Sequence, residues 1–515
     1  MANSRTKNSI LTILTSGFRQ LLTLALSFLS RTLFIYTLGA EYLGLNGLFT
    51  NILSILALSE LGIGSAIAFY LYKPLVDKDR ERIKILMKFY KRCYTYVGLT
   101  ILILGICVMP FLSFLVNLEE KIPENLYFIY FIFLLQNACT YFFFAYKQTL
   151  VSANQELYKI EKLNILFVII NCLTDVLILL IFKDFTTYLI SKLLLVIIKN
   201  IAISNRIDKE YPYLTERCEG NLTSKEIKQF FQDLYSLAIF KFGSALYNSL
   251  SNIIISVMIG TVVVGYYSNY VMIVSQINII YMLIITAITA GVGNVMAKET
   301  KERQIMVYHK LSILTYFVYA FFCICLFQLF NSFINLWLGS IEKEYILSQY
   351  VVLFICINLY IDTSCQLDNV FRQTSGNFKI GKYLQIVGGI TNVILAIPLC
   401  KTYGLTGIFA AQVLSKLITA YFPFLVKVER AVFGFTKWQV LKQWFSKSLL
   451  TLIISIVIWI SCKHLHQTTL TNFFIEILLT VGITLLAFYL AYRKSFVYKE
   501  ITEIIKVKIK KQQAT

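Results

Sequence analysis

Residues 147–162 read KQTLVSANQELYKIEK, and residues 372–382 read RQTSGNFKIGK. Both stretches open with a basic residue before Gln-Thr and later carry the pattern Lys-Ile-x-Lys. Two further matches keep the same order: Ser191-Lys192-Leu193 with Ser415-Lys416-Leu417, and Gly39 and Gly44 with Gly260 and Gly265. The separations run from 220 to 225 residues. Four matches in register indicate a duplicated unit, a common way of building a membrane transporter.

The composition shows what kind of unit is duplicated. Hydrophobic residues make up 57% of the 515 residues and charged residues only 15%, and the mean hydropathy is +0.68. A soluble protein carries about 25% charged residues, so we expect an integral membrane protein. The apolar N-terminal stretch has no small-residue cleavage site and is expected to be a retained helix. The eleven cysteines and three histidines are too scattered to predict a metal site.

The apolar stretches predict fourteen spans, because a bilayer core takes about 20 apolar residues per helix. The spans lie near residues 9–38, 43–72, 93–116, 125–146, 163–182, 186–204, 229–258, 262–297, 311–336, 346–371, 383–400, 404–426, 443–462 and 470–492. We expect an all-α polytopic membrane protein with two six-helix lobes related as a parallel repeat, plus two additional C-terminal helices. The predicted parts are an N-lobe over 1–204, a cytoplasmic linker over 205–228, a C-lobe over 229–428, and spans 13 and 14 with a basic cytoplasmic tail over 429–515.

Charge in the connecting segments predicts the orientation. The segments on the side of both termini hold 37 of the 48 Lys and Arg residues, whereas the opposite loops hold 5. Cationic loops stay cytoplasmic, so both termini are expected inside the cell. This asymmetry explains the formal net charge of +20 without nucleic acid as a partner.

Charges within the predicted spans mark candidate functional residues, since a charge at mid-bilayer costs roughly 2.5–3.5 kcal/mol unless it faces a partner or water. At middle depths, five basic residues face three acidic ones: Arg19, Arg31, Lys192, Lys241 and Lys416, with Glu60, Asp175 and Asp362. We therefore expect an interior that is cationic on balance. Asp233, Asp368, Lys447 and Glu476 lie nearer span ends and are expected to reach water.

Depth along the helices suggests partners for some of these charges. With about 1.5 Å of rise per residue, Asp175 and Lys192 fall at nearly the same depth on adjacent spans, which favours a structural ion pair over a substrate role. Arg19 and Glu60 also lie at similar depths. Asp362 could neutralise either Lys416 or Lys241, but not both.

Polar stripes on two spans at equivalent repeat positions predict a lined cavity. They follow one helix face at spacings of three, four and seven: Thr12, Ser16, Gln20, Thr23, Ser27 and Arg31, and Lys241, Ser244, Asn248 and Ser251. A cationic, water-filled cavity suits a pyrophosphate. Its predicted lining is Arg19, Arg31, Lys241, Lys416, Ser27 and Asn248. The alternatives are that the stripes join helices through hydrogen bonds and that Arg31 reaches the outer interface.

Three stretches carry a family resemblance: SRTLF at 30–34, LGAEYLGLNGL at 38–48 and LSELGIGSAI at 58–67. They resemble the first two helices of Wzx-type polysaccharide flippases of the multidrug/oligosaccharidyl-lipid/polysaccharide (MOP) exporter superfamily. The resemblance implies a multi-pass protein of the bacterial cytoplasmic membrane. It also implies movement of an undecaprenyl-pyrophosphate-linked oligosaccharide, a surface polysaccharide repeat unit, from the inner to the outer leaflet by alternating access. A polysaccharide polymerase would be a further partner.

The energy source and the rival functions follow from what the sequence lacks. There is no Gly-x-x-x-x-Gly-Lys-Ser/Thr phosphate loop, so we expect no ATP hydrolysis, no other enzyme activity and no cofactor. Transport would then use an ion gradient of H⁺ or Na⁺, the membrane potential, or downstream consumption of the product. Glu60 is the candidate coupling carboxylate. A drug or metabolite antiporter and a lipid II flippase of the same superfamily remain alternatives. A membrane polymerase or glycosyltransferase is disfavoured, because the external loops are too short to carry a catalytic centre.

Overall fold

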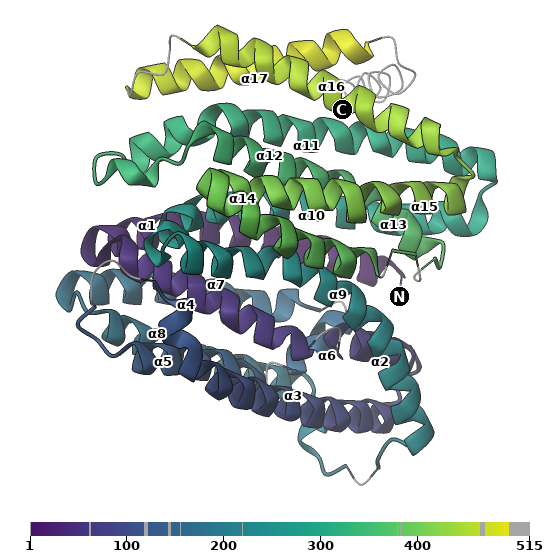
Figure 1. Cartoon of the computed structure of the whole chain (residues 1–515). Coiled ribbons are helices and arrows are strands. Elements are labelled where there is room, and N and C mark those ends of the chain that lie inside the picture. The colour runs from purple at the N-terminus through teal and green to yellow at the C-terminus, as the bar shows by residue number, and fades with distance from the viewer. Residues whose placement is uncertain are drawn as a thin grey trace, which may run out of the picture. The chain divides into compact units, whose positions relative to one another are not determined.

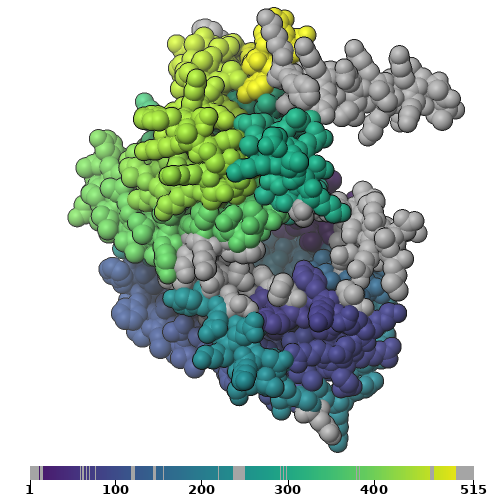
Figure 2. Space-filling model, turned by 90° about the vertical axis from the view of Figure 1, so that its right-hand side faces the viewer, coloured from purple at the N-terminus to yellow at the C-terminus, as the bar shows by residue number. Residues whose placement is uncertain are grey.

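The computed structural model describes residues 2–60, 63–117, 122–142, 146–154, 156–218, 220–377, 380–381, 383–463 and 469–493. Figure 2 shows in colour the residues whose side chains are placed. Every regular element in these ranges is a helix, and none is a strand, which agrees with the predicted all-α class. The basic tail predicted at the C-terminus lies outside the described residues from 494 onward.

Contacts divide the chain into two compact units, Met1–Ser268 and Asn269–Thr515. The predicted lobe boundary at 228 stays a prediction. The first unit contains α1 (Ala2–Leu56), η1 (Ala57–Glu60), α2 (Ile63–Asp77), α3 (Arg80–Val108), η2 (Met109–Phe111), α4 (Leu112–Leu115), α5 (Leu126–Phe142), α6 (Lys147–Ala153), α7 (Tyr158–Ile181), α8 (Phe185–Glu210), η3 (Pro212–Thr215), α9 (Ser224–Met258) and the start of α10 (Thr261–Lys298).

The second unit contains the rest of α10, α11 (Lys301–Leu338), η4 (Lys343–Tyr345), α12 (Gln349–Ser364), α13 (Gln366–Thr374), α14 (Leu384–Ser415), the π-helical segment η5 (Lys416–Tyr421), α15 (Phe422–Phe433), α16 (Lys437–Cys462) and α17 (Leu470–Tyr492). Helices α16 and α17 pack on each other and on α11, and Figure 1 shows them side by side. Val440 of α16 joins a core cluster with Ile361, Val413, Tyr421 and Leu425.

Ten of the described helices are long and apolar enough to cross a membrane, or eleven if the bent pair α5 and α6 is one span. The protein is therefore a multi-pass membrane protein, while the count of fourteen is not confirmed. Two of the ten helical stretches contain a break, at Gly39 and at Gly404. The stretch with Gly404 covers the predicted spans 383–400 and 404–426, whereas the stretch with Gly39 ends at Leu56 and covers only the first part of the predicted span 43–72. Helix α9 corresponds to the predicted span 229–258, but the side chains of 236–249 lie outside the described ones.

The backbone breaks recur with the interval of the sequence repeat. Gly39 has a φ of 85° and Gly260 one of 149°, and they are 221 residues apart. Lys183, between α7 and α8, has a φ of 51°, and Gly404 has one of 56°. These two residues are also 221 apart. A non-glycine residue seldom takes a positive φ, so its occurrence at Lys183 reflects a sharp turn fixed by the flanking helices.

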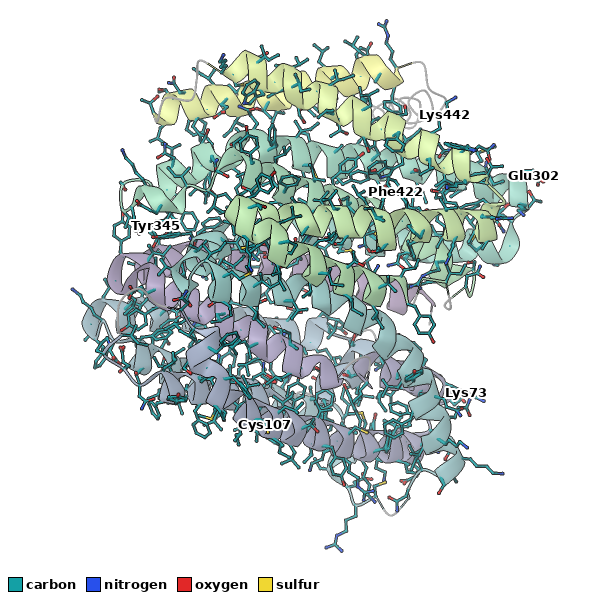
Figure 3. All side chains as sticks on the ribbon, in the orientation of Figure 1. Lys73, Cys107, Glu302, Tyr345, Phe422 and Lys442 are labelled. Atoms are coloured by element: carbon teal, nitrogen blue, oxygen red, sulfur yellow. The ribbon has the colours of Figure 1, made fainter. Side chains whose placement is uncertain are left out.

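The ends of the second unit agree with the predicted alternation of loops. In Figure 3, Glu302 on α11 and Lys442 on α16 lie at one end, whereas Tyr345 on η4 lies at the other. The charge pattern puts the first two in cytoplasmic segments and Tyr345 in an external one. The direction of the unit across the membrane stays a prediction.

Candidate functional site

The ion pair between α7 and α8 is present in the first unit. Lys192 Nζ donates to Asp175 Oδ2 at 2.8 Å, and only 4% of Asp175 is exposed. The Lys192 ammonium also lies over the ring of Tyr188, 5.3 Å from its centroid. Ser30 of α1 hydrogen-bonds to Asp175 as well. Because a buried charge is costly without a partner, these contacts hold three helices together at one depth.

Arg19 pairs with Glu161 and not with Glu60, the carboxylate at similar depth. Its Nε lies 2.8 Å from Glu161 Oε2, and Ser16 donates to the same carboxylate at 3.1 Å. Glu60 instead accepts hydrogen bonds from Tyr94 at 2.6 Å and from another tyrosine hydroxyl, that of Tyr141, at 2.8 Å. The proximity of Arg19 and Glu60 in depth is thus not a contact. Depth says nothing about rotation around the helix axis, and α1 turns this face toward α7.

The second unit has a corresponding pair. Lys416, at the first position of the π-helical segment, lies 2.8 Å from Asp362 Oδ2 and 2.9 Å from its Oδ1. Asp362 therefore neutralises Lys416. Together with the pairs at Arg19 and Lys192, this reduces the cationic excess that was expected for the interior. The side chains of Lys241 and Asn248 lie outside the described ones.

Arg31 connects α1 to the first turns of α10. Its guanidinium donates to the hydroxyl of Ser268, and its side chain is half-buried. Ser27, one turn earlier, donates to the carbonyl of Leu24 at 2.8 Å. The Ser27 hydroxyl is thus used within its own helix, whereas Arg31 reaches across to another one.

A polar cavity of about 290 Å³ lies in the first unit, between α1, α5 and α8. Its polar lining comprises Asn46, Thr50, Ser54, Gln136, Asn137, Thr140 and Lys192. Of these residues, only Lys192 is among the candidates predicted from the sequence. A signal was available, because residues 46, 50 and 54 recur every four positions and so share one helix face.

An apolar pocket of about 470 Å³ lies in the second unit, where α16 packs against α11 and α12. Its walls include Phe327, Cys356, Ile357, Trp444, Ile456 and Trp459. Ser448, Thr451 and Ser455 of α16 also line it, and their hydroxyls are hydrogen-bonded within the protein. Cavities of 300–1,000 Å³ are typical of small-molecule sites. The walls suit a hydrocarbon chain, since they offer almost no polar group.

Comparison with known proteins shows which solved structures have a similar fold. No protein-family model and no curated protein sequence matches the chain. The structure is similar to the lipid II flippase MurJ in an inward closed conformation, with a TM-score of 0.65 and 17% identity over 94% of this chain and 99% of that chain. It is also similar to an inward-facing MATE multidrug-resistance transporter of the MOP superfamily, with a TM-score of 0.65 and 14% identity over 79% of this chain and 94% of that chain.

A third neighbour is the MATE multidrug transporter DinF-BH, with a TM-score of 0.61 and 16% identity over 84% of this chain and 96% of that chain. At these identities the likeness establishes the fold. The chain therefore has the fold of MATE transporters and of MurJ. These neighbours are named as transporters and a flippase, and none of the three is named as an enzyme.

Proposed function

We propose that this protein moves an undecaprenyl-pyrophosphate-linked oligosaccharide from the inner to the outer leaflet of the bacterial cytoplasmic membrane by alternating access, with both termini in the cytoplasm. The observation that carries this proposal is the apolar pocket between α16 and the helices α11 and α12. Each buried methylene contributes about 0.8 kcal/mol, so a branched isoprenoid chain would bind there strongly.

The similarity to MurJ supports the same proposed function. It extends over 94% of the chain, and MurJ is named as a flippase of a lipid-linked molecule. The MATE similarity covers 79–84% in the two examples above. The sequence motifs at 30–34, 38–48 and 58–67 support the polysaccharide branch over lipid II as the cargo.

For the pyrophosphate we propose Arg31 as the principal contact and Lys241 as the second. Arg31 already reaches across to a hydroxyl on another helix, and a guanidinium presents paired donors to phosphate oxygens. Arg19 and Lys416 each hold a carboxylate, so we assign them to structure. Glu60 accepts two tyrosine hydroxyls, and we assign it to tying η1 to α3 and α5.

Deleting the gene and following lipid-linked sugars tests this function. The proposal predicts that the completed undecaprenyl-linked oligosaccharide accumulates on the cytoplasmic leaflet and that surface polysaccharide is lost. Normal surface polysaccharide combined with altered drug tolerance would favour the antiporter instead. Accumulation of lipid II would favour the peptidoglycan precursor as the cargo.

The pocket can be tested within the same strain. Ser455 lines the pocket and donates to Thr451 O at 2.9 Å, and Ser461 on the same helix is exposed and donates to Val457 O at 2.8 Å. Ser455→Trp should fill the pocket and fail to restore export. Ser461→Trp makes the same chemical change outside the pocket and should restore it. If both variants restored export equally at equal abundance, the pocket would have no role in export.

A further inference from the structure

Two carboxyl groups lie buried together in the second unit, where α11, α13, α15 and α16 meet. Asp368 of α13 is 3% exposed and Glu429 of α15 is 5% exposed. The expectation that Asp368 would reach water was wrong, because α11 and α15 both pack against α13 and cover it. The predicted spans leave Glu429 in a loop, but α15 continues to Phe433 and this residue is buried.

A tyrosine hydroxyl bridges the two carboxyl groups. Tyr308 of α11 donates to Asp368 Oδ1 at 3.0 Å, and its hydroxyl also interacts with the Glu429 carboxyl, which lines the same small cavity. A phenol has one hydrogen to donate. It can therefore satisfy one carboxylate, and the second carboxyl can complete the chain only by carrying a proton of its own and donating it to the phenol oxygen.

The net charge of the cluster also indicates that the two carboxyl groups share one proton. Lys447 of α16 donates to the Ser312 carbonyl at 3.2 Å and to its hydroxyl at 2.6 Å, and its charge acts on both carboxyl groups through space. Two ionised carboxylates with one ammonium leave a net negative charge in a buried site. Two like charges so close together cannot both remain ionised without a large cost. One proton restores neutrality.

A small cavity beside Glu429 could hold a water molecule that delivers a proton to the cluster. Glu429 Oε2 is buried and has no hydrogen-bond partner among the described residues. It borders a cavity of about 30 Å³ that Tyr308, Asp368, Gln443 and Lys447 also line. This volume admits about one water molecule, which is enough to relay a proton.

Within the described part of the chain, no ion pair joins Asp368 or Glu429 to a further cation. His309 stacks on Phe435 and is repelled by the charge of Lys447. Arg372 turns away to donate to Ile380 O at 2.9 Å. Tyr421 and Cys365 interact with Asp368 only through space.

We propose that Asp368 and Glu429 form a binding site for a single proton, bridged by Tyr308 and balanced by Lys447. With the proton bound, the carboxyl–hydroxyl–carboxylate chain holds α13, α11 and α15 together. When the proton leaves, the two carboxylates repel each other and this contact opens. Lys447 comes from α16, which also forms a wall of the apolar pocket, so proton release would act on the proposed lipid site. Proton binding stands by itself, whereas its link to transport rests on the proposed function.

Infrared difference spectroscopy tests the proton site on the purified full-length protein in lipid nanodiscs, titrated across pH without substrate. The wild type should show a protonated-carboxyl C=O band that is lost as the pH rises. Glu429→Gln and Asp368→Asn should each abolish this band, because Lys447 then neutralises the remaining carboxylate. Lys447→Met should keep the band to higher pH. Glu302→Gln, an exposed change of the same kind on α11, should leave it unchanged.

Unchanged titration of the band in both Glu429→Gln and Asp368→Asn would overturn the proton site. Thermal melting of each variant establishes folding. If either variant does not fold, Tyr308→Phe keeps both carboxyl groups, removes the bridge and should shift the pH at which the band is lost. No shift in that variant would overturn the site as well.

Transport is measured separately, as pH-dependent flipping of an undecaprenyl-pyrophosphate oligosaccharide in proteoliposomes. The wild-type rate should depend on pH, and Glu429→Gln should lose that dependence. The same pH dependence in both would overturn the link between proton and transport. A titrating band without any flipping would leave the proton site standing and refute the proposed function.

Discussion

Gly44 and Gly265 lie back to back although they are 221 residues apart in the chain. A Cβ atom on Gly265 would stand 2.9 Å from the backbone nitrogen of Gly44, and one on Gly44 would stand 2.8 Å from the carbonyl carbon of Thr261. The two glycines are equivalent positions of the sequence repeat. The contact therefore joins equivalent positions of the predicted repeat within the first unit.

Substituting Gly44 tests this close approach. Gly44→Ala should lower the thermal stability in detergent, because the backbone of α10 would have to move. Overpacking of this kind costs about 1–3 kcal/mol. Gly17, on the same helix, has nothing within 4 Å of a built Cβ, so Gly17→Ala should leave the melting temperature unchanged or raise it. Equal melting temperatures for the two variants would contradict the contact.

The pair of Asp175 and Lys192 predicts a strongly non-additive response. Lys192→Met leaves a buried carboxylate without its partner and should cost about 3–5 kcal/mol of stability. Asp175→Asn combined with Lys192→Met removes both charges and should recover most of the loss. A double variant as unstable as Lys192→Met alone would show that the pair does not hold α7 and α8 together.

A double-mutant cycle decides which carboxylate belongs to Arg19. Arg19→Met with Glu161→Gln should show a coupling of about 0.5–3 kcal/mol in unfolding free energy, since the two side chains are in contact. Arg19→Met with Glu60→Gln should be additive. Coupling to Glu60 and not to Glu161 would contradict the arrangement described for α1 and α7.

Whether a contact could be predicted from the sequence depended on the geometric information that the prediction required. Depth along two consecutive spans needs only the rise per residue, and Asp175 and Lys192, placed together by that argument, are in contact. Partners on non-consecutive helices also need the rotation of each helix, which is why Arg19 is found with Glu161.

Span boundaries limited the candidate site most. The predicted spans leave Glu161 and Glu429 in loops, although α7 starts at Tyr158 and α15 ends at Phe433. Glu476 was expected to reach water near the outer end of its span. It is instead 1% exposed and accepts a hydrogen bond from Gln328 at 2.7 Å. Helices that continue past the apolar stretch bury such charges, and hydropathy alone cannot show where packing continues.

Arg31 is the residue whose loss should impair transport without unfolding the protein. Arg31→Gln keeps a donor for Ser268 but removes the charge, so we expect at least a tenfold loss of export at normal abundance, about 1.4 kcal/mol or more. Arg206→Gln removes the charge of an exposed side chain that pairs with Glu210 on α8, and it serves as the control. Normal export by Arg31→Gln would remove Arg31 from the pyrophosphate site.

Flipping of a lipid-linked oligosaccharide by the purified protein is the most direct test of the proposed cargo. Proteoliposomes carrying an undecaprenyl-pyrophosphate oligosaccharide are exposed to a membrane-impermeant reagent that modifies only outward-facing sugars. We expect the wild-type protein to make the internal pool accessible, Ser461→Trp to do the same, and Ser455→Trp to fail. Accessibility no greater than in protein-free liposomes would contradict the proposed cargo.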